Sequence, residues 1–575
     1  MKNKIIILAA VLTLNLELAF AQSIDTAQVS LNYSNTQGTF NNYLFSAGVG
    51  PYDPNSYILS RDGGFKLIHC GAGAFAGGNV NDPMQYDFTA NDQDVNAIIN
   101  NGMEPFIYLG QPPSQPPNLA DYATVIKNFI RHYTQGWDNG YYYNIKVVRW
   151  GNEPDLSMFW TGTQQEFFDT YAAVSNAVKS LDSTIIIDAP EFAFPVSWSG
   201  NTRVLSSWVT NFLSYCQTNN VKVDIFAFHA YNSTAYYQFY SDLTLMNNAL
   251  SAYPTLSNIY GTPKLGNNEW NTRLGDEWSG GQYGYQFDSA WVAAHNILAL
   301  SAMTAQGLTI STRMGGTFNS PVPNCHDFLL TDCNSIGKPS YFAFKGFNML
   351  AGDSIVQTTG SDYINFSATS GKSADTITLV LSNFDALTYL NRFEPDPLFP
   401  PYIDYNKYVA DFGTPAVYEY VRIDANNLPW TSNSIKVLHY LVDDNNDLNL
   451  INTSAYGGTS SLSFTAAMAA PSVHVFKIFK ESLTGIDVQP DQNNYITVYP
   501  NPSNGKFNLV IAIKNEKKGK QSQIEIYNEL GECIYKSLIL NPQSLIDISS
   551  QPNGIYFYRV TNEQQLIGNG KIVIQ

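Results

Sequence analysis

Between about residues 44 and 311, short apolar runs alternate with longer segments that carry apolar residues at helical spacing. Residues 122–133 and 167–178, for example, each place aromatic and β-branched side chains on one helical face. Eight apolar runs, each followed by a helical segment, predict an α/β fold, the (β/α)8 TIM barrel. The alternative, an open doubly wound sheet, rarely needs eight such units. The apolar runs are residues 44–48, 65–69, 104–109, 146–150, 184–188, 223–229, 264–269 and 307–311.

The pattern changes after residue 350, where strands separated by Asn, Asp, Gly and Pro replace the helical segments. These strands predict an appended β-sandwich over residues 351–484, which an early strand at residues 24–33 is expected to join. A polar linker follows at residues 485–495, and residues 496–575 predict a small all-β domain with tight turns. The predicted sandwich strands are residues 377–383, 416–423, 434–442 and 473–479.

The first residues predict an export signal. Lys2 and Lys4 precede an apolar stretch at residues 5–14, and Ala19-Phe20-Ala21 is a small-residue cleavage site. We therefore expect a signal peptide over residues 1–21 and a barrel over residues 22–350. No later segment approaches the roughly 18 consecutive apolar residues of a spanning helix, so no membrane span is predicted.

Charge and cysteine content narrow the functional classes. The formal net charge of −17 argues against binding to nucleic acid or to anionic membranes. Cys70, Cys216 and Cys533 lie in predicted strands or helices and are expected to be buried, whereas Cys325 and Cys333 flank a short loop as either a disulfide or two free thiols. No cluster has zinc, calcium or phosphate-loop spacing, so no metal or cofactor is predicted.

The fourth predicted barrel strand ends at Asn152 and Glu153. Pro154 disfavours the α region for the preceding residue, so we expect Glu153 to be extended. Trp150 and Trp160 lie on either side, and an aromatic-walled opening would favour the protonated carboxyl. A solvated glutamate in a loop is the competing interpretation of this motif alone.

The seventh predicted strand ends at Glu269, and a barrel gathers the carboxyl ends of its strands at one rim. Glu153 and Glu269 are therefore expected to face each other across the space that a sugar ring would fill. Cleavage of a glycosidic bond requires such a pair, one acid and one nucleophile or base.

At these residues the chain resembles clan A glycoside hydrolases, and within the clan family 39, which contains β-xylosidases and α-L-iduronidases. The similarity extends over about residues 40 to 480. The final segment resembles the C-terminal sorting domain of type IX secretion. The stretches that carry the first resemblance are Trp150-Gly151-Asn152-Glu153-Pro154, Phe228-His229-Ala230-Tyr231, Glu269-Trp270-Asn271-Thr272 and Lys338-Pro339-Ser340-Tyr341.

The resemblance implies that Glu153 is the acid/base catalyst and Glu269 the nucleophile. It also implies that Asn152 hydrogen-bonds the sugar 2-hydroxyl. His229 and Tyr231 are expected to orient Glu269 or to contact the sugar. A core histidine bonded to the backbone is the competing interpretation of His229.

Other residues near the strand ends bear on sugar recognition. Trp270 is close enough to a strand end to stack on a sugar face, although most tryptophans of the barrel are expected to lie in its core. Arg313 follows the eighth strand and either binds an acidic substituent or pairs with a structural carboxylate. Asp155 and Asn268 depart from the family pattern, which leaves the sugar specificity open.

Together these features predict a retaining glycoside hydrolase that is secreted or displayed at the cell surface. Its expected partners are a carbohydrate substrate and the type IX secretion machinery. A non-catalytic carbohydrate-binding protein and an inverting hydrolase remain as alternatives. The sugar, the linkage, and the choice between endo and exo cleavage are not determined by the sequence.

Overall fold

The computed structural model describes most of the chain in two compact units, one ending at residue 481 and the other beginning at residue 482. Each unit is described by itself. The predicted signal peptide, Cys325, Cys333 and most of the predicted linker lie outside the described residues. The described residues are 24–47, 54–71, 73–200, 202–231, 238–272, 288–316, 330–332, 336–384, 416–481, 494–513, 522–528, 531–539, 543–562 and 565–575.

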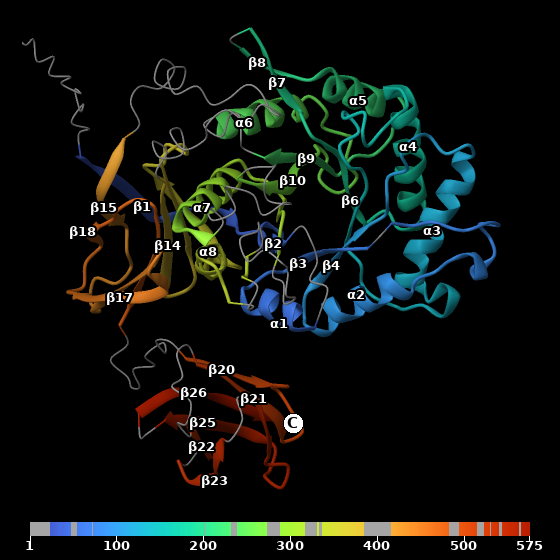
Figure 1. Cartoon of the computed structure of the whole chain (residues 1–575). Helices are drawn as coiled ribbons and strands as arrows, with labels where there is room; N and C mark the ends of the chain where they lie inside the picture. The colour runs from blue at the N-terminus through green and yellow to red at the C-terminus, as the bar shows by residue number, and fades with distance from the viewer. Residues whose placement is uncertain are drawn as a thin grey trace, which may run out of the picture. The chain divides into compact units, whose positions relative to one another are not determined.

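Eight parallel strands form a closed barrel in the first unit (Figure 1). This confirms the predicted barrel, and each strand overlaps one of the eight apolar runs. The barrel strands are β2 (Ser46–Ala47), β3 (Leu67–Cys70), β4 (Glu104–Tyr108), β5 (Val147–Arg149), β6 (Ile186–Phe192), β9 (Ile225–Tyr231), β10 (Lys264–Asn271) and β11 (Ile310–Arg313).

Helices surround the barrel, and local sequence signals set their ends. In α4 a capping box joins Thr163 and Glu166, and the apolar face predicted for residues 167–178 is buried. In α3 the Asn118 side chain caps the first turn, and Gly136 ends the helix in the left-handed region with φ of 69°. The helices are α1 (Pro54–Asp62), α2 (Thr89–Asn100), α3 (Leu119–Gln135), α4 (Gln164–Leu181), α5 (Ser207–Thr218), α6 (Phe239–Leu250), α7 (Ala290–Ala305) and α8 (Pro339–Phe347).

Short elements complete the loops of the barrel. A two-stranded hairpin follows β6, and single helical turns lie at the ends of several connections. These elements are the strands β7 (Val196–Ser199) and β8 (Thr202–Leu205) and the 3₁₀ turns η1 (Asn42–Leu44), η2 (Pro83–Gln85), η3 (Trp137–Asn139) and η7 (Asn348–Leu350).

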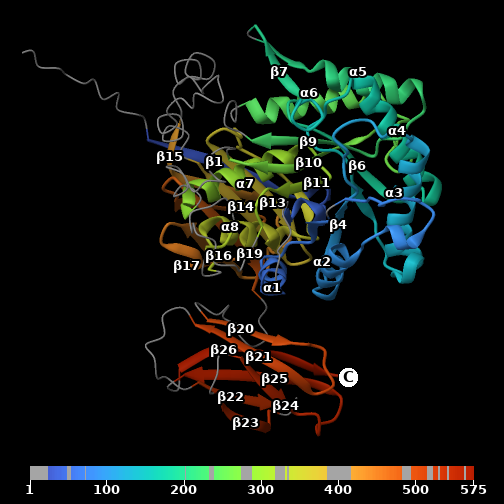
Figure 2. The ribbon, with the colours of Figure 1, turned by 45° about the vertical axis from the view of Figure 1, so that its right-hand side comes forward.

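A nine-stranded sheet is appended to the barrel (Figure 2). The rings of Tyr456 in β17 and Phe464 in β18, its two edge strands, lie 6.1 Å apart, and the sheet encloses an apolar core of its own. The early strand β1 joins it beside β12 and β15, as predicted. The strands are β1 (Ile24–Thr39), β12 (Ser354–Thr359), β13 (Phe366–Lys372), β14 (Thr376–Asn383), β15 (Val417–Asn426), β16 (Ile435–Asp443), β17 (Asn446–Tyr456), β18 (Ser461–Ala467) and β19 (Ser472–Lys480).

The outer face of this sheet packs on α7, which explains why that helix is apolar on nearly all sides. Two polar contacts fix the packing. The Ser382 hydroxyl donates to the Ala294 carbonyl at 2.6 Å, and the Asp444 carboxylate accepts from the Ala290 amide at 2.7 Å at the start of α7. The barrel and the outer face of the sheet therefore share one continuous core.

The second unit is a small all-β structure with a separate apolar core, in agreement with the prediction. It contains one sheet of three strands and one of four. The first consists of β20 (Asn494–Tyr499), β21 (Lys506–Ile513) and β24 (Gln543–Asp547), and the second of β22 (Ser522–Tyr527), β23 (Cys533–Ile539), β25 (Gly554–Asn562) and β26 (Gln565–Ile574).

The cysteine prediction was wrong at one position. Cys70 and Cys216 are buried as expected, but Cys533 is exposed, because it begins β23 at the edge of the four-stranded sheet. Within the described part of the chain, no helix is long and apolar enough to cross a membrane.

Candidate active site

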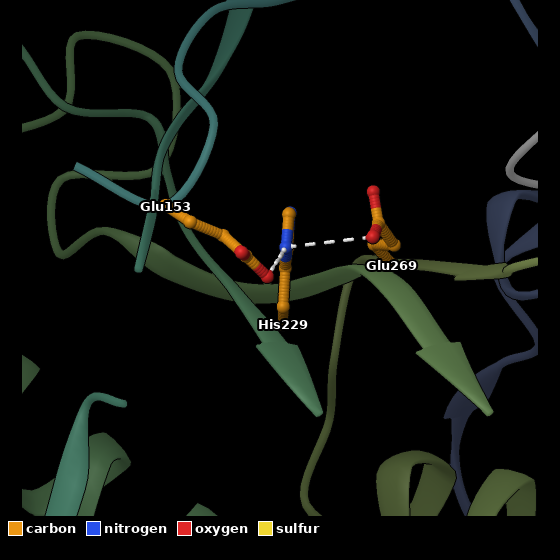
Figure 3. Close-up of side chains that lie close together, drawn as sticks. All are labelled: Glu153, His229 and Glu269. Atoms are coloured by element: carbon orange, nitrogen blue, oxygen red, sulfur yellow. Dashed lines mark hydrogen bonds and ion pairs between the residues drawn. The ribbon is translucent and has the colours of Figure 1, made fainter. Parts of the chain in front are cut away.

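Three side chains carried by the barrel strands β5, β9 and β10, or by the residues just after them, meet at the carboxyl ends of the strands (Figure 3). Glu153 follows β5, His229 lies in β9, and Glu269 lies in β10. Nδ1 of His229 lies 2.8 Å from Oε1 of Glu153 and 3.8 Å from Oε1 of Glu269. The polar atoms of the three residues lie within 4.8 Å of one another. The two carboxylates are partly open to solvent, with side-chain exposures of 11% and 19%, whereas His229 is buried.

The backbone at Glu153 corrects one prediction. Its φ is 47°, in the left-handed region, so the residue is not extended. Its amide donates to the Glu191 carbonyl at 2.8 Å, and its carbonyl accepts from the Leu156 amide at 2.9 Å. These two bonds fix a turn that Pro154 alone would not predict. Gly151 is required beside it, because a Cβ there would lie 2.2 Å from the Pro190 carbonyl oxygen.

Trp150 and Trp160 do not form the aromatic wall that was expected around Glu153. Trp150 is fully buried on the outside of the barrel, where its indole nitrogen donates to the Tyr122 hydroxyl at 2.9 Å. Trp160 is buried beside Phe167 in the same layer. Successive residues of a strand face opposite sides, so Arg149 points into the barrel and Trp150 points toward the helices. Glu153 therefore meets a histidine instead of a tryptophan.

His229 contacts the expected acid/base residue more closely than the expected nucleophile. Its Nδ1 bonds Glu153, while its Nε2 lies 3.4 Å from Oε2 of Glu191. Burial opposes the charged ring, but the Glu269 charge and the contacts with Glu153 and Glu191 outweigh it and raise the pKa of His229 to about 10. His229 therefore lies among three carboxylates, which together favour a proton on its ring.

Tyr231 and Asn152 lie beside the two carboxylates. The Tyr231 hydroxyl donates to Oε1 of Glu269 at 2.7 Å. The backbone of Asn152 is held from both sides by the Gln111 side chain, which accepts from its amide at 2.8 Å and donates to its carbonyl at 3.0 Å. Gln111 thus fixes the backbone of Asn152 at the rim. The contact of the Asn152 side chain with a sugar hydroxyl stays a prediction.

A buried ion pair lies behind the site and is not among the residues predicted from the sequence. Arg149 and Glu191 are almost inaccessible, and the guanidinium holds both carboxylate oxygens, with its Nε 2.9 Å from Oε1. Arg149 also contacts Nε2 of His69 at 2.7 Å. Burial opposes ionisation, but Arg149 and His229 outweigh it and lower the pKa of Glu191. The signals in the sequence are an arginine inside one apolar run, Arg149, and a glutamate three residues after the end of the next, Glu191.

Asp188 and Asn268 form a second polar contact below the site. Both are fully buried, and the Asn268 amide donates to a carboxyl oxygen of Asp188. Burial, and then the Glu191 charge, raise the pKa of Asp188 well above its ordinary value. Asn268 therefore ties β10 to β6 directly below Glu269.

Asp155, the second departure from the family pattern, has a structural contact. Its carboxylate accepts from the amides of Ala193 and Phe194 at 2.9 and 2.8 Å. It thereby joins the loop after β5 to the loop after β6. The loop that carries Glu153 is thus held to the loop that follows β6, the strand of Glu191.

The structure does not bring Trp270 or Arg313 to the open rim. Trp270 is 1% exposed, packs against Phe344, and donates to the Ser311 hydroxyl at 2.9 Å. Arg313 is fully buried, and its NH1 group donates to the carbonyls of Met314 and Gly315. Their burial does not favour contact with a sugar, and the binding of an acidic substituent by Arg313 stays a prediction.

Glu153, His229 and Glu269 are also the one group of side chains in the described ranges whose spacing would suit a metal ion. In the observed arrangement, however, Nδ1 of His229 already bonds Glu153, and Glu269 accepts from Tyr231. These contacts match proton transfer between the residues themselves.

Comparison with known proteins gives two family matches. A model described as "Glycosyl hydrolases family 39" matches residues 73–386, more than half of the chain. A second, "Secretion system C-terminal sorting domain", matches residues 497–575. A β-xylosidase of Geobacillus stearothermophilus is 28% identical over 174 residues, which are 26% of this chain and 31% of the relative. The match thus spans about a third of the curated relatives' length.

Solved structures share the fold. A glucosidase from Croceicoccus marinus superposes with a TM-score of 0.62 at 19% identity, over 80% of this chain and 100% of the other. A monomeric β-xylosidase from Caulobacter crescentus superposes with a TM-score of 0.57 at 16% identity, over the same shares. At these identities the likeness establishes the architecture of barrel and appended sheet.

Proposed function

The chain belongs to glycosyl hydrolase family 39, and from this premise we propose that it is a secreted retaining glycoside hydrolase. Its substrate would be a polysaccharide or an oligosaccharide derived from one. Glu153 would serve as the acid/base catalyst and Glu269 as the nucleophile. The β-xylosidase relatives make β-xylosides the first substrates to test.

The observation that carries this proposal is the close approach of the two carboxylates. Oxygen atoms of Glu153 and Glu269 lie within 4.8 Å of each other. Retaining enzymes hold their carboxyl groups about 5–5.5 Å apart, whereas inverting enzymes leave roughly 6.5–9.5 Å for a water molecule. The short separation supports direct attack by Glu269 and disfavours the inverting alternative.

The surroundings of the two residues support different roles. Glu269 accepts a hydrogen bond from Tyr231 and lies 3.8 Å from Nδ1 of His229, so a phenol and an imidazole orient its carboxylate. Glu153 shares a short hydrogen bond with His229, which gives it a partner for a proton. In this mechanism Glu269 attacks the anomeric carbon while Glu153 protonates the departing oxygen. Glu153 then removes a proton from the water that releases the sugar.

The second family match supports export. The sorting domain implies recognition by a type IX secretion machinery and a secreted or cell-surface location. A substrate outside the cell agrees with this location.

Hydrolysis of aryl glycosides tests the proposal, beginning with β-xylosides and extending to β-glucosides and uronides. Glu269→Ala is expected to lower kcat by about 10³-fold or more. Added azide should restore turnover and give a glycosyl azide of inverted configuration. Asp224→Asn provides a matched control, because Asp224 is a buried carboxylate paired with Lys179 just before β9 begins, away from the strand ends that carry the site. If the wild-type chain bound sugars but cleaved none of these glycosides or the parent polysaccharides, the non-catalytic alternative would replace the proposal.

A further inference from the structure

His229 lies between two carboxylates that differ in their freedom to hold a proton. On one side, Glu191 is buried, ionised, and held by Arg149 at both oxygens. An ionised carboxylate can only accept, so it favours hydrogen on the ring nitrogen that faces it, Nε2 at 3.4 Å. The contact is longer than a strong hydrogen bond. It acts as an ion pair in which the charge of Glu191 favours a proton on Nε2.

On the other side, the 2.8 Å contact between Nδ1 and Oε1 of Glu153 requires one proton between the two atoms. The proton can reside on Glu153, with a neutral ring as acceptor, or on Nδ1, with a cationic ring as donor. Both forms contain the same number of protons. With Nε2 fixed as a donor, the choice between them depends on the position of this single proton.

We propose that Glu191, held by Arg149, is a positioning residue that keeps the proton on Nε2 of His229, so that His229 and Glu153 share the proton used in acid–base catalysis. The inference rests on the proposed function and deepens it. Glu191 touches neither sugar nor leaving group in this scheme and acts through His229.

The proton balance of the two half-reactions follows. In the first, an electron pair of Glu269 forms a bond to the anomeric carbon, and the glycosidic bond breaks with its electron pair on the leaving oxygen. That oxygen receives the shared proton from Glu153. In the second, water attacks the anomeric carbon, the bond to Glu269 breaks with its electron pair on the carboxylate, and the water proton returns to the pair of Glu153 and His229.

The charges around His229 act together on this proton. Glu153 faces the ring from the loop after β5, Glu191 from β6 and Glu269 from β10, while Arg149 and the buried Asp188 lie behind Glu191. Removing the charge of Glu191 weakens the hold of the Glu153–His229 pair on its proton. The pair then loses the proton at lower pH.

Glu191→Gln keeps the shape of the side chain and removes its charge. We expect kcat/KM to fall by about 10²-fold for glycosides with poor leaving groups, which need the proton, since general acid catalysis contributes about 10²–10⁴-fold. With dinitrophenyl glycosides, which need little protonation, the loss should be about threefold or less. The basic limb of the pH profile should move to lower pH by about one unit. Glu191→Asp, which keeps the charge, should restore most of the wild-type pH profile.

Asp224→Asn is the matched control. Asp224 belongs to a buried ion pair and immediately precedes β9, so it lies at the end of that strand opposite to His229. This variant should leave the dependence on leaving group and on pH unchanged. If Glu191→Gln lowered kcat/KM equally for all leaving groups and left the pH profile unmoved, Glu191 would be merely structural and the inference would be wrong.

A second test uses the wild-type protein, so its result does not depend on whether the Glu191 variants fold. Among seven histidines, ¹⁵N resonances of the imidazole rings report which nitrogen is protonated, and His229→Gln identifies the signals of His229. We expect a protonated Nε2 from about pH 5 to pH 9. A neutral ring protonated only at Nδ1 would overturn the inference. Absence of any glycosidase activity in the wild type would instead overturn the proposed function, independently of this result.

Discussion

At the scale of single residues, the two proposed catalytic carboxylates differ in their partners. Glu269 accepts from a phenol, whereas Glu153 meets an imidazole that is itself held by a buried carboxylate. Neighbours of different chemistry are the means by which proteins give different roles to two groups of the same type.

Tyr231→Phe tests the role assigned to the phenol. A hydrogen bond to a charged group contributes roughly 1.5–3 kcal/mol, so kcat/KM is expected to fall by about 10–100-fold. Steady-state kinetics on one aryl glycoside would measure the loss. Tyr122→Phe is the matched control, because its hydroxyl bonds Gly110 and Trp150 outside the barrel. Equal losses in both variants would show that the contact with Glu269 has no special role.

The proximity of the two glutamates was predictable from the sequence, because their position depends only on strand order. Glu153 and Glu269 end two barrel strands, and a barrel brings such ends together whatever the side-chain details. The partners could not be predicted in the same way. The contact of Arg149 with Glu191 depends on the inward direction of both side chains and on a left-handed turn at Glu191, where φ is 66°. Periodicity does not specify either feature.

At the scale of elements, β6 connects the site to the barrel interior. It carries Asp188 and Glu191, and the loop that follows it is held by Asp155. The eight barrel strands were predictable because buried parallel strands appear as apolar runs. Strands β12, β13, β17 and β18 were not predicted, since their exposed or polar faces resemble loops in the sequence.

A histidine pair in the appended sheet predicts loss of stability in acid. Nε2 of His439 lies 2.7 Å from Nδ1 of His474, between β16 and β19. Burial lowers the pKa of His439 to about 4, and burial with the His439 charge lowers that of His474 to about 3. Both rings are neutral when folded, so their contribution is complete above about pH 6.5 and is lost as the pH falls toward 4 and 3.

We therefore expect the pair to lower the free energy of unfolding by about 3–5 kcal/mol between pH 6.5 and pH 4.5, measured by urea denaturation. Replacing both histidines by glutamine should reduce this slope. Part of the slope should remain, because burial also lowers the pKa of His295, to about 3. An unchanged slope in the double variant would contradict the assignment to this pair.

At the scale of the whole molecule, the chain divides into a unit that contains the candidate site and a unit that matches a sorting domain. Each has its own apolar core. The first unit needs both the barrel and the appended sheet, because they share the packing around α7.

Deleting residues 498–575 tests this division. The remaining chain should keep its kcat within about twofold, because none of the deleted residues belongs to the site. In a host with type IX secretion it should accumulate in the periplasm instead of reaching the medium or the cell surface. Fractionation and an activity assay would measure both effects. Normal secretion of the truncated chain would show that residues 498–575 are not the export signal.

The central claim is that Glu269 attacks the sugar directly while Glu153 handles the proton. The configuration of the first sugar released by the wild-type enzyme tests it most directly, because two displacements retain the anomer and one displacement inverts it. ¹H NMR of the reaction, recorded before the sugar mutarotates, distinguishes the two. We predict the same anomeric configuration in product and substrate. Release of the opposite anomer would contradict the account and would make Glu269 a general base.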